Sequence, residues 1–225
     1  MTNEPFGTCS NLPDEIQDIF IDLCQDIAIL HGKWKLYVDL FSKSENIEIL
    51  NDLAPSSFHL IEKSIADDLI ISICRLSDPL ESFGHTNLSL LTLIDRMNHV
   101  HGIKKGKRDF ENKCKPVRKY RNKRVGHNDL NFALKPHDTP LPKIPRKTFD
   151  EILKIAANIM NLISGHYSET EFDFQPAQID DADSLISWLK KGRDAFRDEH
   201  GIKKVKRYNK SLHPTFDRRA AAKSG

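Results

Sequence analysis

Apolar residues recur every three or four positions along most of the chain, which is the spacing of a helix with one buried face. The first such stretch covers residues 13–41, and it is either one long helix or two helices separated near Gly32. The second covers residues 58–76 and ends before Pro79, because the residue before a proline disfavours the helical conformation. The apolar line of the second helix consists of Phe58, Ile61, Ile65, Leu69, Ile73 and Leu76. These stretches predict helices as the main elements of the fold.

The same spacing predicts two helices in the middle of the chain. Residues 88–99 form the first of them, and the lysine-rich residues 103–108 connect it to the second. The second covers residues 110–126 and contains Pro116, so either a new helix starts near Lys115 or one helix kinks there.

Two more helices complete the pattern, one over residues 148–163 and one that begins at Asp181 or Asp183 and ends at Gly201. No stretch alternates with period two for long enough to require a sheet. We therefore predict an all-α bundle of about six or seven helices in residues 1–200, followed by a basic, disordered tail in residues 201–225. The aromatic residues expected in the core are Trp34, Tyr37, Trp188 and Phe196.

The composition narrows the class of protein. With 10 glycines, 11 prolines and 39% hydrophobic residues among 225, the chain is neither collagen-like nor disordered as a whole. Its four cysteines lie far apart without a Cys-x-x-Cys pair, which argues against a structural zinc site and a disulfide framework. The longest uncharged helical stretch, residues 155–167, is shorter than the roughly 20 residues that cross a bilayer. We therefore expect a soluble cytoplasmic protein that contacts no membrane.

The net charge of +2 hides an uneven distribution. Residues 101–127 contain eleven Lys and Arg residues against Asp109 and Glu111, a balance of +9. Residues 201–225 contain eight against Asp217, a balance of +7, so the rest of the chain carries a balance of −14. An acidic body with two basic segments suggests a polyanionic partner. A solvated helix face and a charged tail would explain the charges equally well.

Residues 120–129 lie at the end of the first basic segment and read Tyr-Arg-Asn-Lys-Arg-Val-Gly-His-Asn-Asp. Cleavage of RNA without a metal needs a base for the 2′-hydroxyl proton and cations for the charged phosphorus centre. His127 titrates near neutral pH and suits the proton transfer. Arg121 offers phosphate oxygens a planar fork of donors, and Asn122 can orient the phosphate or the imidazole.

The spacing of these residues sets a condition on the backbone. In a regular helix Arg121 and His127 lie about 120° apart around the axis and about 9 Å apart along it. They converge only if the helix loosens, and Gly126 favours helix termination at that point. The alternative is that His127 is a helix-end residue contacting the last carbonyls and that the basic residues form a solvated face.

Arg121-Asn122, followed by His127 after four further residues, resembles the Arg/His motif of the HEPN superfamily (higher eukaryotes and prokaryotes nucleotide-binding). Together with the upstream segments 73–79, Ile-Cys-Arg-Leu-Ser-Asp-Pro, and 87–90, Asn-Leu-Ser-Leu, the motif resembles the abortive-infection branch of that superfamily. The likeness covers residues 14–165.

This resemblance implies a helical homodimer that cuts RNA without a metal or another cofactor. Arg121 would bind the scissile phosphate, His127 would act as base or acid, and Asn122 would support them in a cleft shared by two copies. The residues expected to follow the RNA backbone are Lys113, Lys115, Arg118, Lys119, Lys123 and Arg124, and the supporting residues are Asp129, Arg75 and Asp78. Asp129 either bonds the imidazole or caps the next turn, and Arg75 with Asp78 either lines the cleft or forms a helix-end ion pair.

The function expected from the resemblance is that of a toxin or phage-defence effector that a cognate antitoxin neutralises. Two other functions agree with the same residues. A helical protein with this basic segment can bind nucleic acid or a nucleotide without cleaving it. An acidic helical body can also serve as an interaction module that docks an antitoxin.

Overall fold

The structure, a computed structural model, describes residues 9, 11–125, 144–168, 171–174, 181–201 and 216, without the side chains of Arg124 and Val125. These residues form seven α-helices, one short π-helix and a two-stranded antiparallel hairpin. The predicted all-α class is therefore confirmed. The chain divides into two compact units, residues 1–31 with 69–175 and residues 32–68 with 176–225.

Two long helices contribute to both units. Helix α1 (Asp14–Phe41) is uninterrupted, so the alternative with a break near Gly32 is wrong. Helix α3 (Pro55–Leu76) buries Leu69, Ile73 and Leu76 in its second half, as its apolar spacing predicts.

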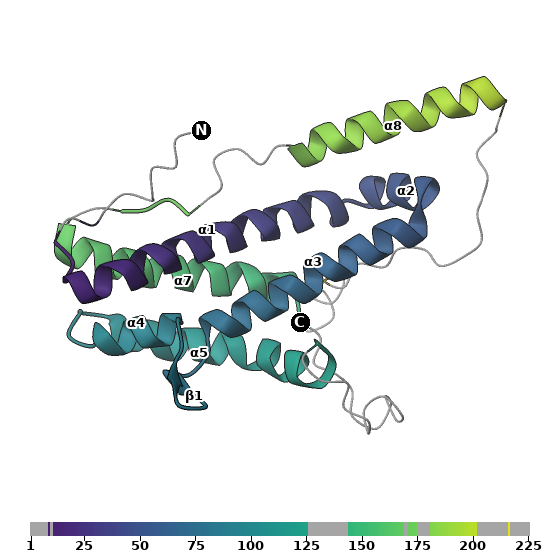
Figure 1. The fold of residues 1–225 in the computed structure, drawn as a ribbon. Helices are drawn as coiled ribbons and strands as arrows, with labels where there is room; N and C mark the ends of the chain where they lie inside the picture. Colours follow the sequence, from purple (N-terminus) through teal and green to yellow (C-terminus); the bar gives the residue numbers. More distant parts are fainter. Residues whose placement is uncertain are drawn as a thin grey trace, which may run out of the picture. The chain divides into compact units, whose positions relative to one another are not determined.

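The first unit adds α4 (Leu90–Arg96), α5 (Ile103–Tyr120), the π-helix η1 (Arg121–Val125) and α7 (Arg146–Ser168) to its parts of α1 and α3. Helices α5 and α7 lie side by side (Figure 1). Their close approach requires a glycine, because a Cβ atom at Gly106 would lie only 2.9 Å from Cγ1 of Ile159. The fully buried side chains of this unit include Phe20, Leu23, Ile27, Leu69, Ile70, Phe110 and Phe149.

Helix α5 differs from its prediction at two points. It begins at Ile103, inside the stretch expected to be a connection, directly after Gly102 with its φ of +83°. It also continues through Pro116, so the alternative with a new helix near Lys115 is wrong. The apolar residues Ile103, Phe110, Cys114 and Val117 are all buried along one side of the helix. This packing outweighs the one backbone hydrogen bond that the proline removes.

The second unit contains α2 (Ser44–Leu53), α8 (Asp181–His200) and the remaining parts of α1 and α3. Helix α8 contacts α2 through charged side chains: Arg193 Nη1 lies 3.6 Å from Oδ2 of Asp52, and Arg197 pairs with the same carboxylate. The predicted burial of Trp188 and Phe196 is wrong, since the two side chains are 70% and 55% exposed. The helix turns its two arginines, rather than its aromatic residues, toward its neighbour.

An aromatic cluster forms the core of the second unit. Trp34 and Tyr37 are buried as predicted, and their rings stack with centroids 5.7 Å apart. The Tyr37 hydroxyl donates a hydrogen bond of 2.6 Å to Oε1 of Glu62, which is fully buried. The first half of α3 is therefore rotated relative to its predicted line: Glu62 faces inward, and Ile61 is 44% exposed.

The described part of the predicted tail consists of Gly201 and Phe216. Phe216 is buried against the rings of Trp34 and Tyr37, and its N–H donates a 3.0 Å hydrogen bond to the Tyr37 hydroxyl. The division into a domain over residues 1–200 and a tail over residues 201–225 stays a prediction. Among the described residues, no helix combines the length and the apolar character needed to cross a bilayer.

Candidate functional site

The C-terminal end of α3 is tied to α5 by one arginine. Nη1 of Arg118 lies 3.0 Å from the carbonyl oxygen of Cys74, 2.9 Å from that of Ser77, 3.1 Å from the Ser77 hydroxyl and 3.0 Å from Oδ1 of Asp78. The last carbonyls of a helix have no partner within the helix and carry a partial negative charge. Arg118 therefore caps α3 from a neighbouring helix, and this nitrogen is occupied in holding the two helices together.

The acidic partner in this arrangement is Asp78, which pairs with residues of α5 and η1. Its Oδ1 lies 3.0 Å from Arg118 and 4.0 Å from Nη2 of Arg121. Arg75 of α3, which we also predicted as a supporting residue, is exposed. The ion pairs that the structure shows at Asp78 are with Arg118 and Arg121. Two guanidinium groups thus share one carboxylate, which leaves an excess positive charge at the end of α3.

Arg121 lies where this charge meets solvent. Its side chain is 30% exposed, so the residue is not sealed in the interior. Its Nε–H is nevertheless buried and makes no hydrogen bond within the part of the chain that the structure describes. The thiol of Cys74 lies next to Arg121. Burial raises the pKa of this thiol, and this outweighs the charge of Arg121, a hydrogen bond with the Arg121 side chain and the charge of Arg118, all of which lower it. A partly exposed guanidinium is suited to an oxyanion such as phosphate.

The backbone changes its winding at the same residue. Helix α5 passes directly into η1, a π-helix over Arg121–Val125. π-helical turns are rare and occur frequently at functional sites. The helix therefore widens at the arginine of the Arg/His motif, five residues before Gly126, where the sequence suggested loosening.

Two residues of the predicted site, His127 and Asp129, lie outside the described residues. So does Gly126, where we expect the helix to loosen. The separation of Arg121 and His127 and the role of Asp129 therefore stay predictions. Asn122 is exposed next to Arg121, and Lys123 is half-buried. The side chain of Arg124 is also outside the described part of the structure.

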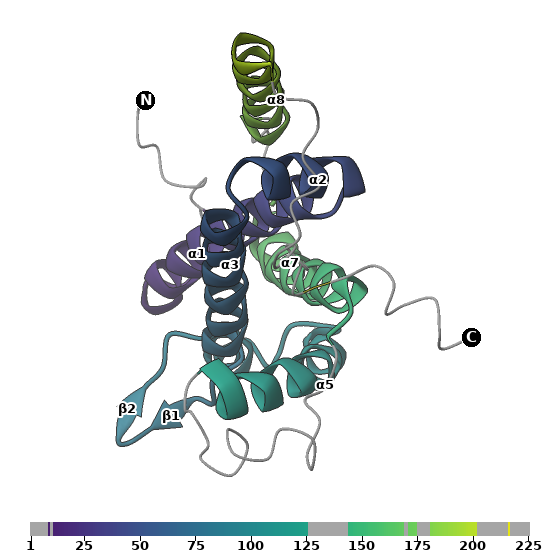
Figure 2. The same ribbon diagram turned by 90° about the vertical axis from the view of Figure 1, so that its right-hand side faces the viewer.

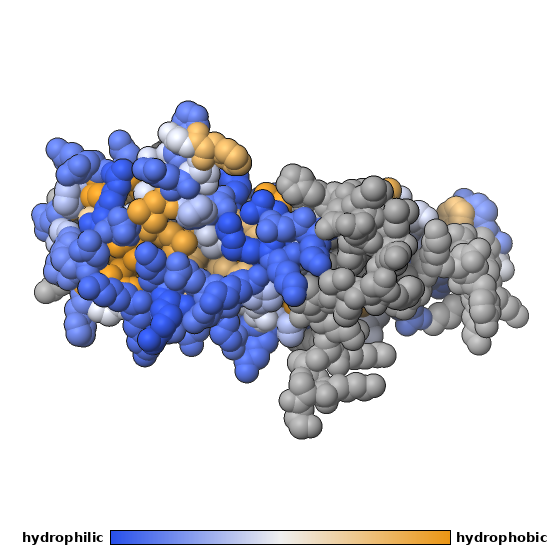
Figure 3. All heavy atoms as spheres, turned by 90° about the horizontal axis from the view of Figure 1, so that it is seen from below, coloured by the Kyte–Doolittle hydropathy of each residue, from blue (hydrophilic) through white to orange (hydrophobic). Residues whose placement is uncertain are grey.

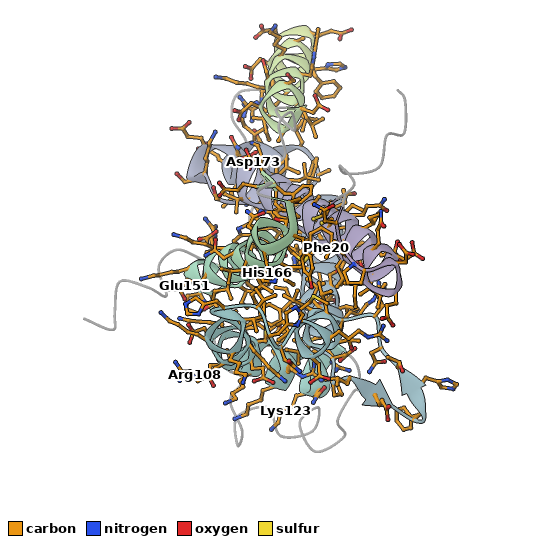
Figure 4. All side chains as sticks on the ribbon, turned by 90° about the vertical axis from the view of Figure 1, so that its left-hand side faces the viewer. Phe20, Arg108, Lys123, Glu151, His166 and Asp173 are labelled. Carbon is orange, nitrogen blue, oxygen red and sulfur yellow. The ribbon has the colours of Figure 1, made fainter. Side chains whose placement is uncertain are left out.

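The lysines of α5 lie on its outer side. Lys115 and Lys119 are exposed, and Lys113 forms an ion pair of 2.5 Å with Glu151 of α7. Figure 4 shows Arg108 and Lys123 pointing away from the helices. In Figure 3 hydrophilic side chains cover most of the described face on which α4 and α5 lie, around a smaller apolar area. The basic segment is therefore presented to solvent, as an RNA-backbone surface requires.

A further feature of this region, a β-hairpin directly after Asp78-Pro79, was not predicted. Strands β1 (Glu81–Ser82) and β2 (His85–Thr86) pair in antiparallel register and are joined by Phe83 and Gly84. Both joining residues have positive φ, +53° and +80°. A two-residue turn of this kind normally carries Asn-Gly or Asp-Gly, so Gly84 is the only signal of the turn in these two residues.

The family model HEPN_AbiU2 (AbiU2) matches residues 13–186. The chain belongs to the AbiU2 family of HEPN domains. The resemblance drawn from residues 73–79, 87–90 and the Arg/His motif is thereby confirmed. No curated protein and no solved structure matches the chain.

The AbiU2 match extends from the first turn of α1 into α8, so it includes every element around Arg121. It links the chain to abortive infection, the defence context that the sequence suggested. Within the described residues of this AbiU2 domain, no group of three or more His, Cys, Asp or Glu side chains is placed to hold a metal ion.

Proposed function

We propose that this AbiU2-family domain is a metal-independent endoribonuclease of toxin or phage-defence type. The observation that supports it most is Arg121: a partly exposed side chain at a widened turn, which shares Asp78 with a second arginine. Family membership and the position of His127, six residues after Arg121, support the same reaction.

The proposed reaction is a transesterification within the RNA chain. The 2′-oxygen attacks the adjacent phosphorus, the bond from phosphorus to the 5′-oxygen breaks, and the products are a 2′,3′-cyclic phosphate and a 5′-hydroxyl. His127 accepts the proton of the 2′-hydroxyl, and a protonated imidazole supplies one to the departing 5′-oxygen. Arg121 binds the phosphate and stabilises the charge that develops on it, while Asn122 orients the reacting groups.

A cleft shared by two copies fits this division of labour. The reaction moves two protons, and one chain carries one histidine in the motif. A homodimer in which Arg121 and His127 face their counterparts would provide both a base and an acid. The exposed Lys115 and Lys119, with Lys113, Lys123 and Arg124, would then follow the RNA backbone on either side. We also propose that a cognate antitoxin neutralises this nuclease.

A second candidate is a protein that binds RNA without cleaving it. The lysines on the outer side of α5 favour this function, because they are presented to solvent independently of His127. Such a protein would bind RNA with a steep salt dependence and would release it intact.

Cleavage of single-stranded RNA in excess chelator tests the proposal. We expect the wild type to cut, and a 2′-deoxy substitution at the cleaved nucleotide to protect the substrate. Arg121→Ala and His127→Ala should each lower the rate by at least about 100-fold, since each removes a group that acts in the transition state. Lys104→Ala is the matched control, because it removes one exposed charge of α5 far along the helix from Arg121 and should leave the rate almost unchanged. Binding without turnover in the wild type would favour the second candidate.

A further inference from the structure

The hairpin after α3 carries an aromatic residue in an unfavourable place. Phe83 lies at the tip, is fully exposed at 103% of its reference area and has a φ of +53°. Side chains with a Cβ avoid this conformation, and bulky ones avoid it most. Burial does not compensate for the strain, because the ring has no covering neighbour among the described residues. Figure 2 shows the hairpin projecting away from the helices.

The base of the hairpin is held firmly although its tip is bare. The Asn87 side chain donates hydrogen bonds of 2.7 Å to the carbonyl oxygen of Pro79 and 2.8 Å to the hydroxyl of Ser82. The Asn87 N–H donates a third, of 2.8 Å, to the carbonyl oxygen of Leu80. The aromatic ring is therefore presented on a braced support, which lowers the entropy lost when something binds to it.

The hairpin lies close in sequence to Asp78, the carboxylate that Arg118 and Arg121 share. Phe83 follows Asp78 by five residues, which span at most about 18 Å of extended chain. Asp78 is the residue that pairs with Arg118 and Arg121. The hairpin contains one carboxylate, Glu81, which lies opposite Thr86 on the strands and not at the tip.

We propose that Phe83 is a stacking platform for an unpaired base of single-stranded RNA whose phosphate is bound at Arg121. This inference rests on the proposed function and adds a second contact for the same RNA, at Phe83. Every base has a π-face that can stack on an aromatic side chain, so the contact tolerates any sequence. It does require a base that is free of its helix, which selects single strands and loops over duplex RNA.

The test measures binding of single-stranded RNA that carries 2-aminopurine, whose fluorescence is quenched by stacking. The protein is the full chain with His127→Ala, so that the RNA stays intact. Phe83→Asn removes the ring and suits a positive φ, so its melting temperature should equal or exceed that of the parent. We expect Phe83→Asn to weaken binding by about 5- to 150-fold and to abolish the quenching. Phe83→Tyr keeps a ring and should retain both, and binding of duplex RNA should be the same for all three proteins.

Three results would overturn the proposal. In the first, Phe83→Asn binds the single strand as tightly as the parent does, while Arg121→Ala weakens binding; the nuclease function then survives without the platform. In the second, Phe83→Asn shifts the protein from dimer to monomer in sedimentation, which makes the ring a contact between copies. In the third, the parent binds no RNA at all, and the platform fails together with the proposed function.

Discussion

At the residue scale, the site depends on how two arginines share one carboxylate. Nη1 of Arg118 binds the end of α3, whereas Nη2 of Arg121 lies 4.0 Å from Oδ1 of Asp78. The Nε–H of Arg121 is buried and makes no hydrogen bond in the described structure. A buried unsatisfied donor costs about 1–3 kcal/mol. This nitrogen is buried, so a phosphate would bind at the exposed part of the Arg121 side chain instead.

Asp78→Asn tests whether the carboxylate positions Arg121. Asparagine keeps an oxygen for Arg118 but removes the charge that holds Arg121, so we expect kcat for RNA cleavage to fall by about 10- to 100-fold. KM should not rise, because the site becomes more positive. Asp109→Asn, on α5, makes the same charge change away from the site and should leave kcat unchanged. Equal effects of the two substitutions on kcat would contradict a positioning role.

His31 gives the fold a pH dependence that can be derived from its surroundings. Burial lowers the pKa of His31 and outweighs the hydrogen bond to the backbone of Leu153 and the charge of Asp173, both of which raise it. As the pH falls, the unfolded chain therefore binds a proton before the folded chain does. The stability that neutral His31 contributes is present above the ordinary pKa of 6.5 and is lost as the pH falls below it.

The prediction is that the wild type loses more free energy of unfolding between pH 8 and pH 5 than His31→Phe does. Phenylalanine keeps a ring against Phe174, which stacks on His31 with centroids 6.3 Å apart, but it cannot be protonated. Urea unfolding at the two pH values provides the measurement. Equal losses in the two proteins would show that other groups dominate the pH dependence.

The candidate site was predictable from sequence only in part, for reasons that particular residues show. The chemistry of Arg121 and Asn122 follows from residue type and spacing. The cap formed by Arg118 could not be predicted, because it joins residues about 40 positions apart. In the sequence, Arg118 looks like any other basic residue of a solvated helix face. Phe83 was missed because a two-residue strand carries no measurable alternation, and its turn lacks the usual asparagine.

At the element scale, the contact between α5 and α7 depends on the absence of a side chain at Gly106. Alanine there gains about 1 kcal/mol of helix propensity, but its Cβ would lie 2.9 Å from Cγ1 of Ile159, inside the normal contact distance. Overpacking of this kind costs about 1–3 kcal/mol. We expect Gly106→Ala to lower the melting temperature.

Gly165→Ala is the matched control for this prediction. It lies in α7 of the same unit, and a Cβ there would meet nothing within 4 Å. No steric clash then opposes the gain in helix propensity, and the substitution should stabilise the protein by up to about 1 kcal/mol. Thermal unfolding of both variants measures the difference. Stabilisation by both would show that α5 and α7 adjust to the added carbon freely.

The helices could be predicted from their apolar spacing, because this spacing does not depend on how the helices pack. The side of each helix that faces a neighbour could be predicted only for some of them. The inner line of α7 follows its sequence period, and Ile152, Ala156 and Ile159 are buried as expected. Trp188 and Phe196 are apolar yet exposed, and the residues of α8 that contact α2 include Arg193 and Arg197, which pair with Asp52. The apolar spacing shows which residues share one face of a helix, but the neighbouring helix determines whether that face is buried.

At the scale of the whole molecule, the separation of charge predicts how RNA binding depends on salt. Each cation that contacts a single strand contributes about 0.7 to the slope of log K against log of salt concentration. The combined change of Lys113, Lys115 and Lys119 to alanine should therefore lower the slope by about 2. Lys33, Lys35 and Lys63 form a control set, because they carry the same charge but belong to the second unit, outside the basic segment. A similar slope change in the control set would mean that only the total charge matters.

The central claim is that Arg121 and His127 cut RNA by 2′-hydroxyl attack without a metal. The ends of the RNA fragments produced in excess chelator test it most directly. We predict 2′,3′-cyclic phosphate and 5′-hydroxyl ends from the wild type and no fragments from His127→Ala. Fragments that appear only after magnesium is added, with 3′-hydroxyl and 5′-phosphate ends, would contradict the claim.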